Sequence, residues 1–259
     1  QKQAKEERKA ESNEAPQKTN KAAKPIRSKL ERRGKKYQKA AGLIDKSKTY
    51  SLKDALELVC KTSTTKFDSS AELHIRLNVD PKQADQNIRD SVTLPAGTGK
   101  TVKVAVFAEE EAANAAVKAG ADIAGTEEIT KALDKGSINF DVLIAPPNLM
   151  SKLAKYARIL GPKGLMPNPK SGTVTADVVK GVEQAKAGRI EYRVDSTGII
   201  HVAIGKVSFG SQKLTSNAKV ILASIKQNKP ASLKGTYVRS ISASSSMGPS
   251  VKIASSELS

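Results

Sequence analysis

Hydrophobic and polar residues alternate along several short stretches of the chain. From Leu73 to Val79, apolar side chains occupy every second position and polar ones lie between them. This period of two predicts a strand with one buried face and one face open to solvent or to a partner. The same reasoning predicts further strands at Val92–Leu94, Ile190–Val194, Ile199–Val207, Tyr237–Ser242 and Val251–Ile253. Because the turn residues 195–198 separate two of them, we expect these two to form a hairpin.

Two amphipathic helices accompany these strands. Ser51 can cap a helix, with Asp54 three residues later. The apolar residues that follow recur on one face of that helix: Leu52, Ala55, Leu56, Val59 and Cys60. A second helix begins near Ser211 and is closed by Pro230. We therefore expect Cys60 to be a core residue, with a reactive thiol as the alternative.

Residues 98–189 follow a different pattern, in which apolar strands alternate with helices. The predicted strands are Val102–Phe107, Asp122–Gly125 and Phe140–Ala145. The predicted helices are Glu109–Lys118, one capped by Thr126, one from Leu149 to Leu160 capped by Asn148, and one opened by Thr175 or Asp177. This alternation is typical of a parallel, three-layer α/β domain.

The α+β pattern resumes after residue 189. The fold class is therefore α/β and α+β in two domains, a discontinuous α+β domain (37–97 plus 189–259) and an inserted Rossmann-like three-layer α/β domain (98–188). Gly97 and Gly188 mark the two crossings, and we expect a hinge there because glycine tolerates changes of backbone angle.

The charge is unevenly distributed. The chain has 44 basic and 26 acidic residues, a net charge of +18. Residues 1–36 hold 13 basic and 5 acidic side chains, and residues 190–259 hold 9 and 3. The first block has too few apolar residues to form a core, so we expect a disordered basic arm. The excess of positive charge indicates a polyanionic partner, and nucleic acid fits best.

Composition excludes several other classes of protein. No apolar run approaches the ~20 residues that a membrane helix needs. A single cysteine permits no internal disulfide and fits a reducing compartment.

The two histidines, His74 and His201, are expected to hydrogen-bond locally on strand surfaces, and a ligand or catalytic role is the alternative. His74 with Arg76 could instead face a phosphate backbone. We expect no metal and no cofactor.

Three loops carry candidate chemistry. Gly97–Thr101 has the glycines and lysine of a phosphate loop, but Leu94 stands where that motif needs glycine, and a strand follows instead of a helix. The stretch Gly161–Gly172 is rigid and bears lysines, so it is either a structural cap or a phosphate contact. Lys66-Phe67-Asp68 and Ser246-Met247-Gly248-Pro249-Ser250 place an apolar side chain beside hydroxyls, which suits an RNA minor groove.

These segments together resemble a known family. The motifs are Lys66-Phe67-Asp68, Leu94-Pro95-Ala96-Gly97-Thr98-Gly99-Lys100, Arg158 through Gly172, Lys186 through Arg193, and Ser246 through Val251. In this order they resemble the bacterial-type family of large ribosomal subunit protein one, over roughly residues 34–254. Ser244-Ser245-Ser246 stands where that family commonly has threonines, so the hydroxyls are kept and the methyl groups are lost.

The resemblance implies a structural, non-enzymatic protein that binds 23S-type rRNA as a monomer within the ribosome, in the cytoplasm. It further implies a mobile stalk near the exit-site tRNA, release of deacylated tRNA, and repression of the protein's own messenger RNA. Carried over residue by residue, rRNA contact falls on Lys66, Phe67, Ser246, Met247 and Gly248. The same transfer extends to Glu72, Arg76, Lys170, Arg189, Lys234 and Thr236.

Two other functions are alternatives to specific rRNA binding. A non-specific nucleic-acid coating protein would explain the charge alone and would bind any duplex equally at a given salt concentration. A nucleotide-dependent enzyme would need a glycine-rich turn between a strand and a helix, and neither 97–100 nor 161–164 has that context.

Overall fold

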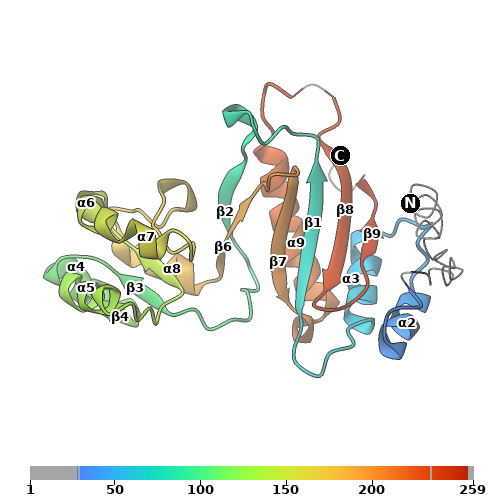
Figure 1. The fold of residues 1–259 in the computed structure, drawn as a ribbon, viewed down its shortest axis with the longest axis horizontal. Coiled ribbons are helices and arrows are strands. Elements are labelled where there is room, and N and C mark those ends of the chain that lie inside the picture. The colour runs from blue at the N-terminus through green and yellow to red at the C-terminus, as the bar shows by residue number, and fades with distance from the viewer. Residues whose placement is uncertain (1–27, 29, 234, 256–259) are drawn as a thin grey trace, which may run out of the picture.

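The computed structural model describes residues 28, 30–233 and 235–255. The expected basic arm falls mostly on residues 1–27, outside the described residues. Figure 1 shows two parts of the molecule joined by a narrow connection. No helix within the described ranges combines the length and the apolar character that crossing a membrane requires.

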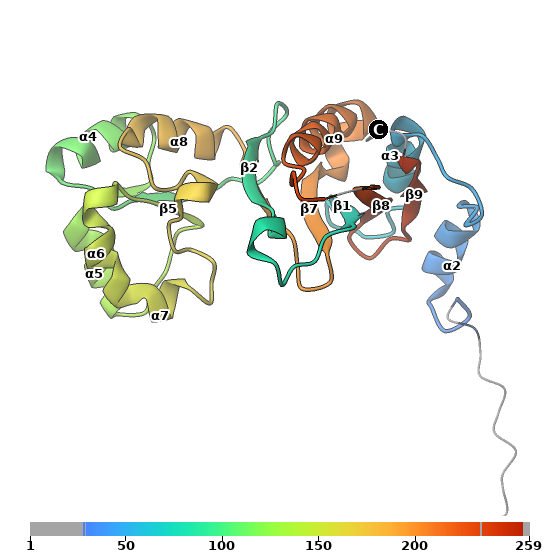
Figure 2. The ribbon, with the colours of Figure 1, turned by 90° about the horizontal axis from the view of Figure 1, so that it is seen from above.

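One part of the molecule is built on a four-stranded antiparallel sheet, which we call the antiparallel unit. Its strand order is β7 (Ile199–Lys206), β1 (Ser70–Leu77), β8 (Val238–Ser245), β9 (Val251–Ile253). Helices α3 (Leu52–Lys61) and α9 (Gly210–Gln227) cover one face of this sheet, as Figure 2 shows. The opposite face carries no described helix.

The alternation in the sequence explains why this sheet has one open face. Leu73, Ile75 and Leu77 are at most 3 % exposed and point to the helices, while the residues between them remain accessible. Ser51 caps α3, because its hydroxyl accepts a hydrogen bond from the Asp54 amide. Both features confirm the predictions from periodicity. Cys60 is half-buried against the same core.

The other part, the parallel unit, has a three-stranded parallel sheet between two helical layers. The strand order is β4 (Ile123–Ala124), β3 (Val104–Val106), β5 (Val142–Ile144). Helices α4 (Glu110–Lys118) and α8 (Val178–Lys186) lie on one face. The other face packs against α5 (Thr126–Asp134), α6 (Met150–Leu153) and α7 (Ala157–Leu160). These three layers, together with the antiparallel unit, confirm the mixed α/β and α+β class.

A two-stranded ribbon of β2 (Arg89–Thr93) and β6 (Arg189–Arg193) connects the two units. The expected hairpin between β6 and the following strand is confirmed at its turn and at one antiparallel bridge, but its two strands do not pair further. The chain does turn at Asp195–Gly198, where Val194 bridges Ile200, but β6 pairs with β2 and β7 pairs with β1. The two strands separate because each finds its hydrogen-bonding partner far away in the sequence.

Three smaller predictions also need correction. The expected helix from Leu149 to Leu160 is broken into η3 (Pro147–Leu149), α6, η4 (Ala154–Tyr156) and α7, and Asn148 does not cap it. Gly125, not Thr126, precedes α5 as its N-cap. The strand predicted to end at Ser242 continues to Ser245, because β8 keeps pairing with β1 through that residue.

The remaining elements are short. Helix α2 (Lys35–Gly42) precedes α3, and one-turn 3-10 helices occur at η2 (Ala84–Gln86), η5 (Pro169–Ser171) and η6 (Val207–Phe209). The residues after Lys100 are extended and lead into β3, so a helix does not follow the Gly97–Thr101 segment.

Candidate nucleic-acid interface

Two loops that are far apart in the sequence meet at one end of the antiparallel sheet. The amide of Ser246 donates to the carbonyl oxygen of Ser70 (3.0 Å), and the amide of Ser70 donates to the Ser246 hydroxyl (3.2 Å). Because Ser70 begins β1 and Ser246 follows β8, this pair of bonds joins loop 63–69 to loop 246–250.

Each loop exposes one large apolar side chain. Phe67 is 61 % exposed and Met247 is 78 % exposed. Met247 has φ 64°, the one positive φ among the described non-glycine residues. A Cβ on Gly248 would collide with the Ser245 hydroxyl, which would have to rotate away. The turn therefore holds Met247 outward in a conformation that its sequence disfavours, which indicates a function outside the fold itself.

Loop 63–69 is fixed from the other side by η6 and β7. The Asp68 carboxylate accepts hydrogen bonds from the Ser208 hydroxyl (2.7 Å) and the Ser208 amide (3.2 Å). The Ser208 hydroxyl is the main reason that the pKa of Asp68 is lowered. Lys206 Nζ donates to the Asp68 carbonyl oxygen (3.2 Å). These contacts hold Phe67 in place and leave Lys66 exposed.

The open face of the sheet extends this surface along the strands. On β1 it carries Glu72, His74 and Arg76, which pair across to three serines of β8: Ser244, Ser242 and Ser240. At about 3.3 Å per residue, the eight-residue strand β1 spans roughly 25 Å. The surface is thus a strip of hydroxyl and charged groups with an apolar tip at each of the two loops.

The two histidines meet on this face, across β1 and β7. His74 Nδ1 lies 2.8 Å from His201 Nδ1, and His74 Nε2 lies 3.0 Å from the Ser244 hydroxyl. Glu72 lies 4.0 Å from His74, and Asp195 lies 3.7 Å from His201. The expectation of locally hydrogen-bonded strand-surface histidines is confirmed.

The His74 environment predicts a pH dependence of stability. Burial, and then the charge of His201, lower the pKa of His74 below its ordinary 6.5, while Glu72 opposes them. The unfolded chain therefore binds more protons, and the free energy of unfolding falls as pH drops through and below 6.5. Replacing His74 by Gln should flatten this fall between pH 7.5 and 5.5, measured by urea unfolding. Equal pH slopes for both proteins would contradict the assignment.

The crossing between the units is tightly packed. Gly97 and Gly188 have φ of 71° and 97°, and a Cβ on Gly188 would lie 2.7 Å from Gly97 Cα. Asn217 of α9, which is fully buried, accepts from the Ala96 amide (3.0 Å) and donates to the carbonyl oxygens of Gly97 (3.0 Å) and Ile204 (2.7 Å). Gly188 is thus needed for close approach, Gly97 is favoured by its positive φ, and Asn217 fixes the crossing to the antiparallel unit.

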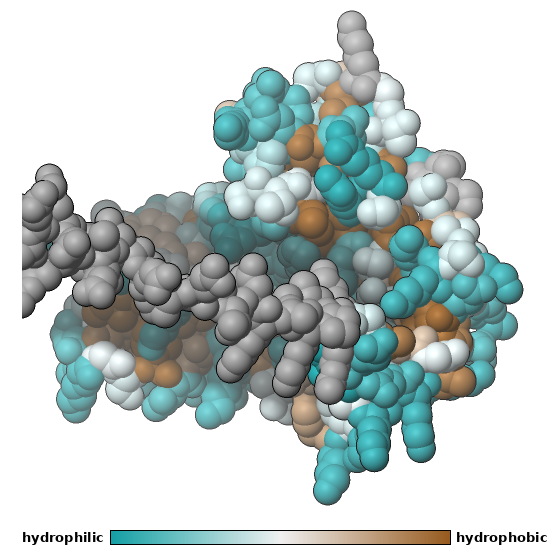
Figure 3. Space-filling view, turned by 45° about the vertical axis from the view of Figure 1, so that its right-hand side comes forward, coloured by the Kyte–Doolittle hydropathy of each residue, from teal (hydrophilic) through white to brown (hydrophobic). Residues whose placement is uncertain are grey.

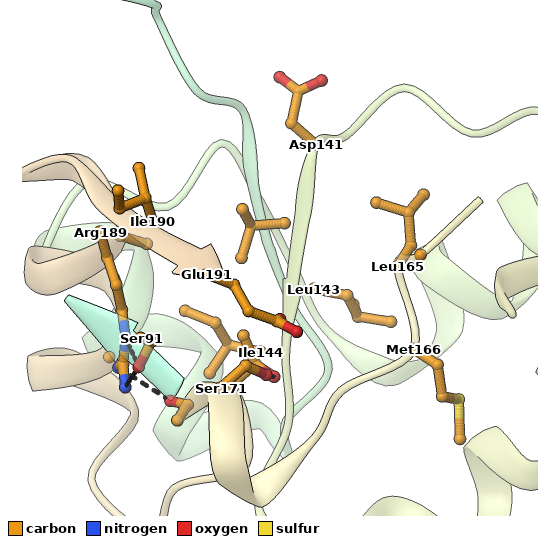
Figure 4. A pocket seen from close by; sticks show the side chains of 16 residues that line it. Ser91, Asp141, Leu143, Ile144, Leu165, Met166, Ser171, Arg189, Ile190 and Glu191 are labelled. Carbon is orange, nitrogen blue, oxygen red and sulfur yellow. Dashed lines mark hydrogen bonds between the residues drawn. The ribbon is translucent and has the colours of Figure 1, made fainter. Parts of the chain in front are cut away.

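Arg189 lies at the same connection. Its guanidinium donates to the Ser91 hydroxyl (2.7 Å), the Gly172 carbonyl oxygen (3.2 Å) and Gln184 Oε1 (2.9 Å). Burial lowers its pKa, although an arginine stays protonated. Figure 4 shows Arg189 at the edge of a pocket of about 210 Å³ between the ribbon and the parallel unit. Arg189 therefore ties the ribbon to the 161–172 loop.

The other predicted contact residues are dispersed. Thr236 is exposed just before β8, at the end of the sheet opposite Met247. Lys170 is exposed on η5, in the parallel unit. Lys234 lies outside the described residues. The structure thus brings together the residues of the two loops and the open face, and separates Lys170 and Arg189 from them.

Several residues of this surface were not singled out from the sequence. Ser242 and Ser240 continue the open face, and Ser208 holds the Phe67 loop. The alternation within β8 was a usable signal for the serines. No local signal pointed to Ser208 or Asn217, because each acts through a contact distant in the sequence.

A scan against family models decides the class of protein. Residues 59–249, more than half of the chain, match the model of the Ribosomal protein L1p/L10e family. The chain belongs to this family. As a member of the Ribosomal protein L1p/L10e family, it is a ribosome-bound, large-subunit ribosomal protein that binds rRNA. The family is one of structural RNA-binding proteins and is not an enzyme family.

Proposed function

We propose that this chain binds its rRNA through the open face of the antiparallel sheet and the two loops at its end. This sheet interface comprises Lys66, Phe67, Glu72, Arg76, Ser242, Ser244, Ser246, Met247 and Gly248. The observation that carries the proposal is the convergence of loops 63–69 and 246–250, each with an exposed apolar side chain. Exposed apolar groups rimmed by polar ones mark interaction sites.

The chemistry of this strip suits RNA better than DNA. An A-form helix displays its 2′-hydroxyls in a wide, shallow minor groove, which a flat strip of serines can meet. Phe67 and Met247 can pack against ribose or an unpaired base, and Arg76 and Lys66 can neutralise phosphates. Glu72 can accept from a 2′-hydroxyl or a base amino group. Thr236 extends this proposed strip at its far end. Lys234, which lies outside the described residues, is proposed as a contact on the resemblance alone.

The resemblance of the sequence to the bacterial-type family adds location, domain roles and regulation to the proposal. We infer a bacterial-type, cytoplasmic protein with an α+β rRNA-binding domain (37–97 plus 189–259) and an inserted domain (98–188). The narrow Gly97–Gly188 crossing supports a stalk that moves near the exit-site tRNA and assists its release. Lys170, exposed on the inserted domain, is available to RNA there. Repression of the protein's own messenger would use the same interface.

A competition assay tests this function. Binding of the full chain to a large-subunit rRNA fragment is measured with random duplex RNA as competitor at fixed salt. We expect the specific fragment to bind at least about 10³-fold more tightly, as specific sites do compared with non-specific ones. Equal competition by random duplex would support a coating protein, whose binding comes from net charge alone.

A further inference from the structure

Helix α2 lies next to the proposed sheet interface but outside the matched residues 59–249. In Figures 1 and 2 it lies at the β9 edge of the sheet, away from the parallel unit. Tyr50 anchors this segment, since its amide donates to the Lys252 carbonyl oxygen (3.0 Å) and its carbonyl accepts from Ala254 (2.9 Å). The Tyr50 hydroxyl accepts from the Asp45 amide (3.0 Å). The segment that follows α2 is therefore paired with β9.

The turn before α2 is held to the helix as well. Gln38 Nε2 donates to the carbonyl oxygens of Arg33 (2.8 Å), Leu30 (3.3 Å) and Glu31 (3.3 Å). The Gln38 side chain, with its two N–H groups shared among these carbonyls, thus ties the turn at 30–33 to α2. On its inner side, Ala40 and Ala41 are 6 % and 7 % exposed.

A groove of about 260 Å³ separates α2 from the Met247 loop. Leu30, Arg33, Tyr37 and Lys46 line it from the α2 side, and Pro249 and Ser250 line it from the loop. The Arg33 guanidinium lies 5.3 Å from the centre of the Tyr37 ring, a cation–π contact that keeps it at the groove. The groove thus has apolar lining residues, two cations and the two hydroxyl-bearing residues Tyr37 and Ser250, near the exposed Met247.

We propose that this groove takes a strand of the rRNA sugar–phosphate backbone, with Arg33 and Lys46 on its phosphates. Continuity with the sheet interface supports this occupant, because RNA lying on Met247 extends past Pro249. Charge complementarity supports it as well, because no acidic side chain lines the groove among the described residues. The proposal rests on the proposed function, and it adds α2 as a third RNA-contacting element. In Figure 3, which turns this side forward, hydrophilic side chains project from the lower part of the molecule.

Paired charge neutralisations in the full-length protein test the proposal. R33Q/K46Q removes the two groove cations. K35Q/K39Q removes two charges from the same segment, but these lysines share the opposite side of the helix and do not line the groove. Both variants lose the same net charge, so any difference between them reports position. Arg33→Lys with Lys46→Arg keeps the charges and serves as the rescue.

The readout is the dissociation constant for an rRNA fragment, measured from 50 to 200 mM salt. We expect R33Q/K46Q to weaken binding about tenfold at 50 mM salt, where affinity is highest. We also expect it to reduce the slope of log K against log[salt] by about two. K35Q/K39Q should leave the slope unchanged, and the charge-keeping variant should bind like the parent. Circular dichroism verifies the fold of each.

The outcomes separate this inference from the proposed function. If R33Q/K46Q behaves like K35Q/K39Q while M247D weakens binding, the groove proposal is wrong and the sheet interface stands. If M247D has no effect but R33Q/K46Q still reduces the salt slope, the groove contacts RNA and the Met247 assignment is wrong.

Discussion

Replacing Met247 by aspartate is expected to weaken binding to the rRNA fragment by at least ~1–3 kcal/mol, the scale of one good specific contact. This corresponds to about 5- to 150-fold in the dissociation constant. The side chain is 78 % exposed on the turn, so the substitution removes an apolar contact and brings a negative charge towards phosphates. Aspartate also tolerates the positive φ of 64°, and the turn is expected to keep its shape.

A matched control separates this contact from a general charge effect. Val117 on α4 is another apolar side chain, 54 % exposed, but it lies in the parallel unit. Val117→Asp makes the same change in net charge and should alter the affinity by less than about threefold. An M247D protein that folds normally and binds like V117D would remove Met247 from the interface.

Replacing Asn217 by alanine is expected to have the largest effect on stability. The side chain is fully buried and satisfies one amide and two carbonyl groups of the crossing and β7. Each buried polar group that loses its partner costs about 1–3 kcal/mol, so we expect a loss of at least ~2 kcal/mol in the free energy of unfolding. Urea unfolding followed by circular dichroism measures this loss.

Native-state hydrogen exchange gives a local readout of the same change. The Ala96 amide loses its acceptor in the Asn217→Ala protein, so its exchange should become faster. Ser216→Ala is the control, because Ser216 is the exposed neighbour on α9 and its loss should cost less than about 0.5 kcal/mol. Equal stability of the two variants would mean that Asn217 does not hold the crossing.

Hydrophobic periodicity predicted a strand or helix correctly where the apolar positions of that element alone show its buried face. The alternation around Leu73 and the spacing along α9 led directly to buried faces that the structure has. The prediction of one continuous helix from Leu149 to Leu160 was wrong, because apolar spacing does not reveal where an α-helix changes to 3-10 turns. The β6–β7 hairpin extends no further than its turn, because a turn motif does not reveal which strand supplies the hydrogen bonds beyond it.

At the candidate site, too, some features could be predicted from the sequence and others only from the structure. Phe67 and Met247 could be singled out in the sequence, because an apolar residue among hydroxyls and glycine is unusual in a loop. Arg189 could be singled out too, but in the structure its guanidinium donates hydrogen bonds to Ser91, Gly172 and Gln184 of the protein itself. Whether a basic residue is free to meet RNA depends on its neighbours in space, which the sequence does not contain.

The sequence by itself determined most of the secondary elements, the two glycine crossings and the polyanionic partner, since these depend on local pattern and total charge. Only the tertiary structure decided that loops 63–69 and 246–250 meet and that β6 leaves β7 for β2. It alone placed α2 beside the Met247 loop. The physical reason is that these contacts join segments separated by up to some two hundred residues, and hydrogen bonds such as Ser246–Ser70 leave no local trace in either segment.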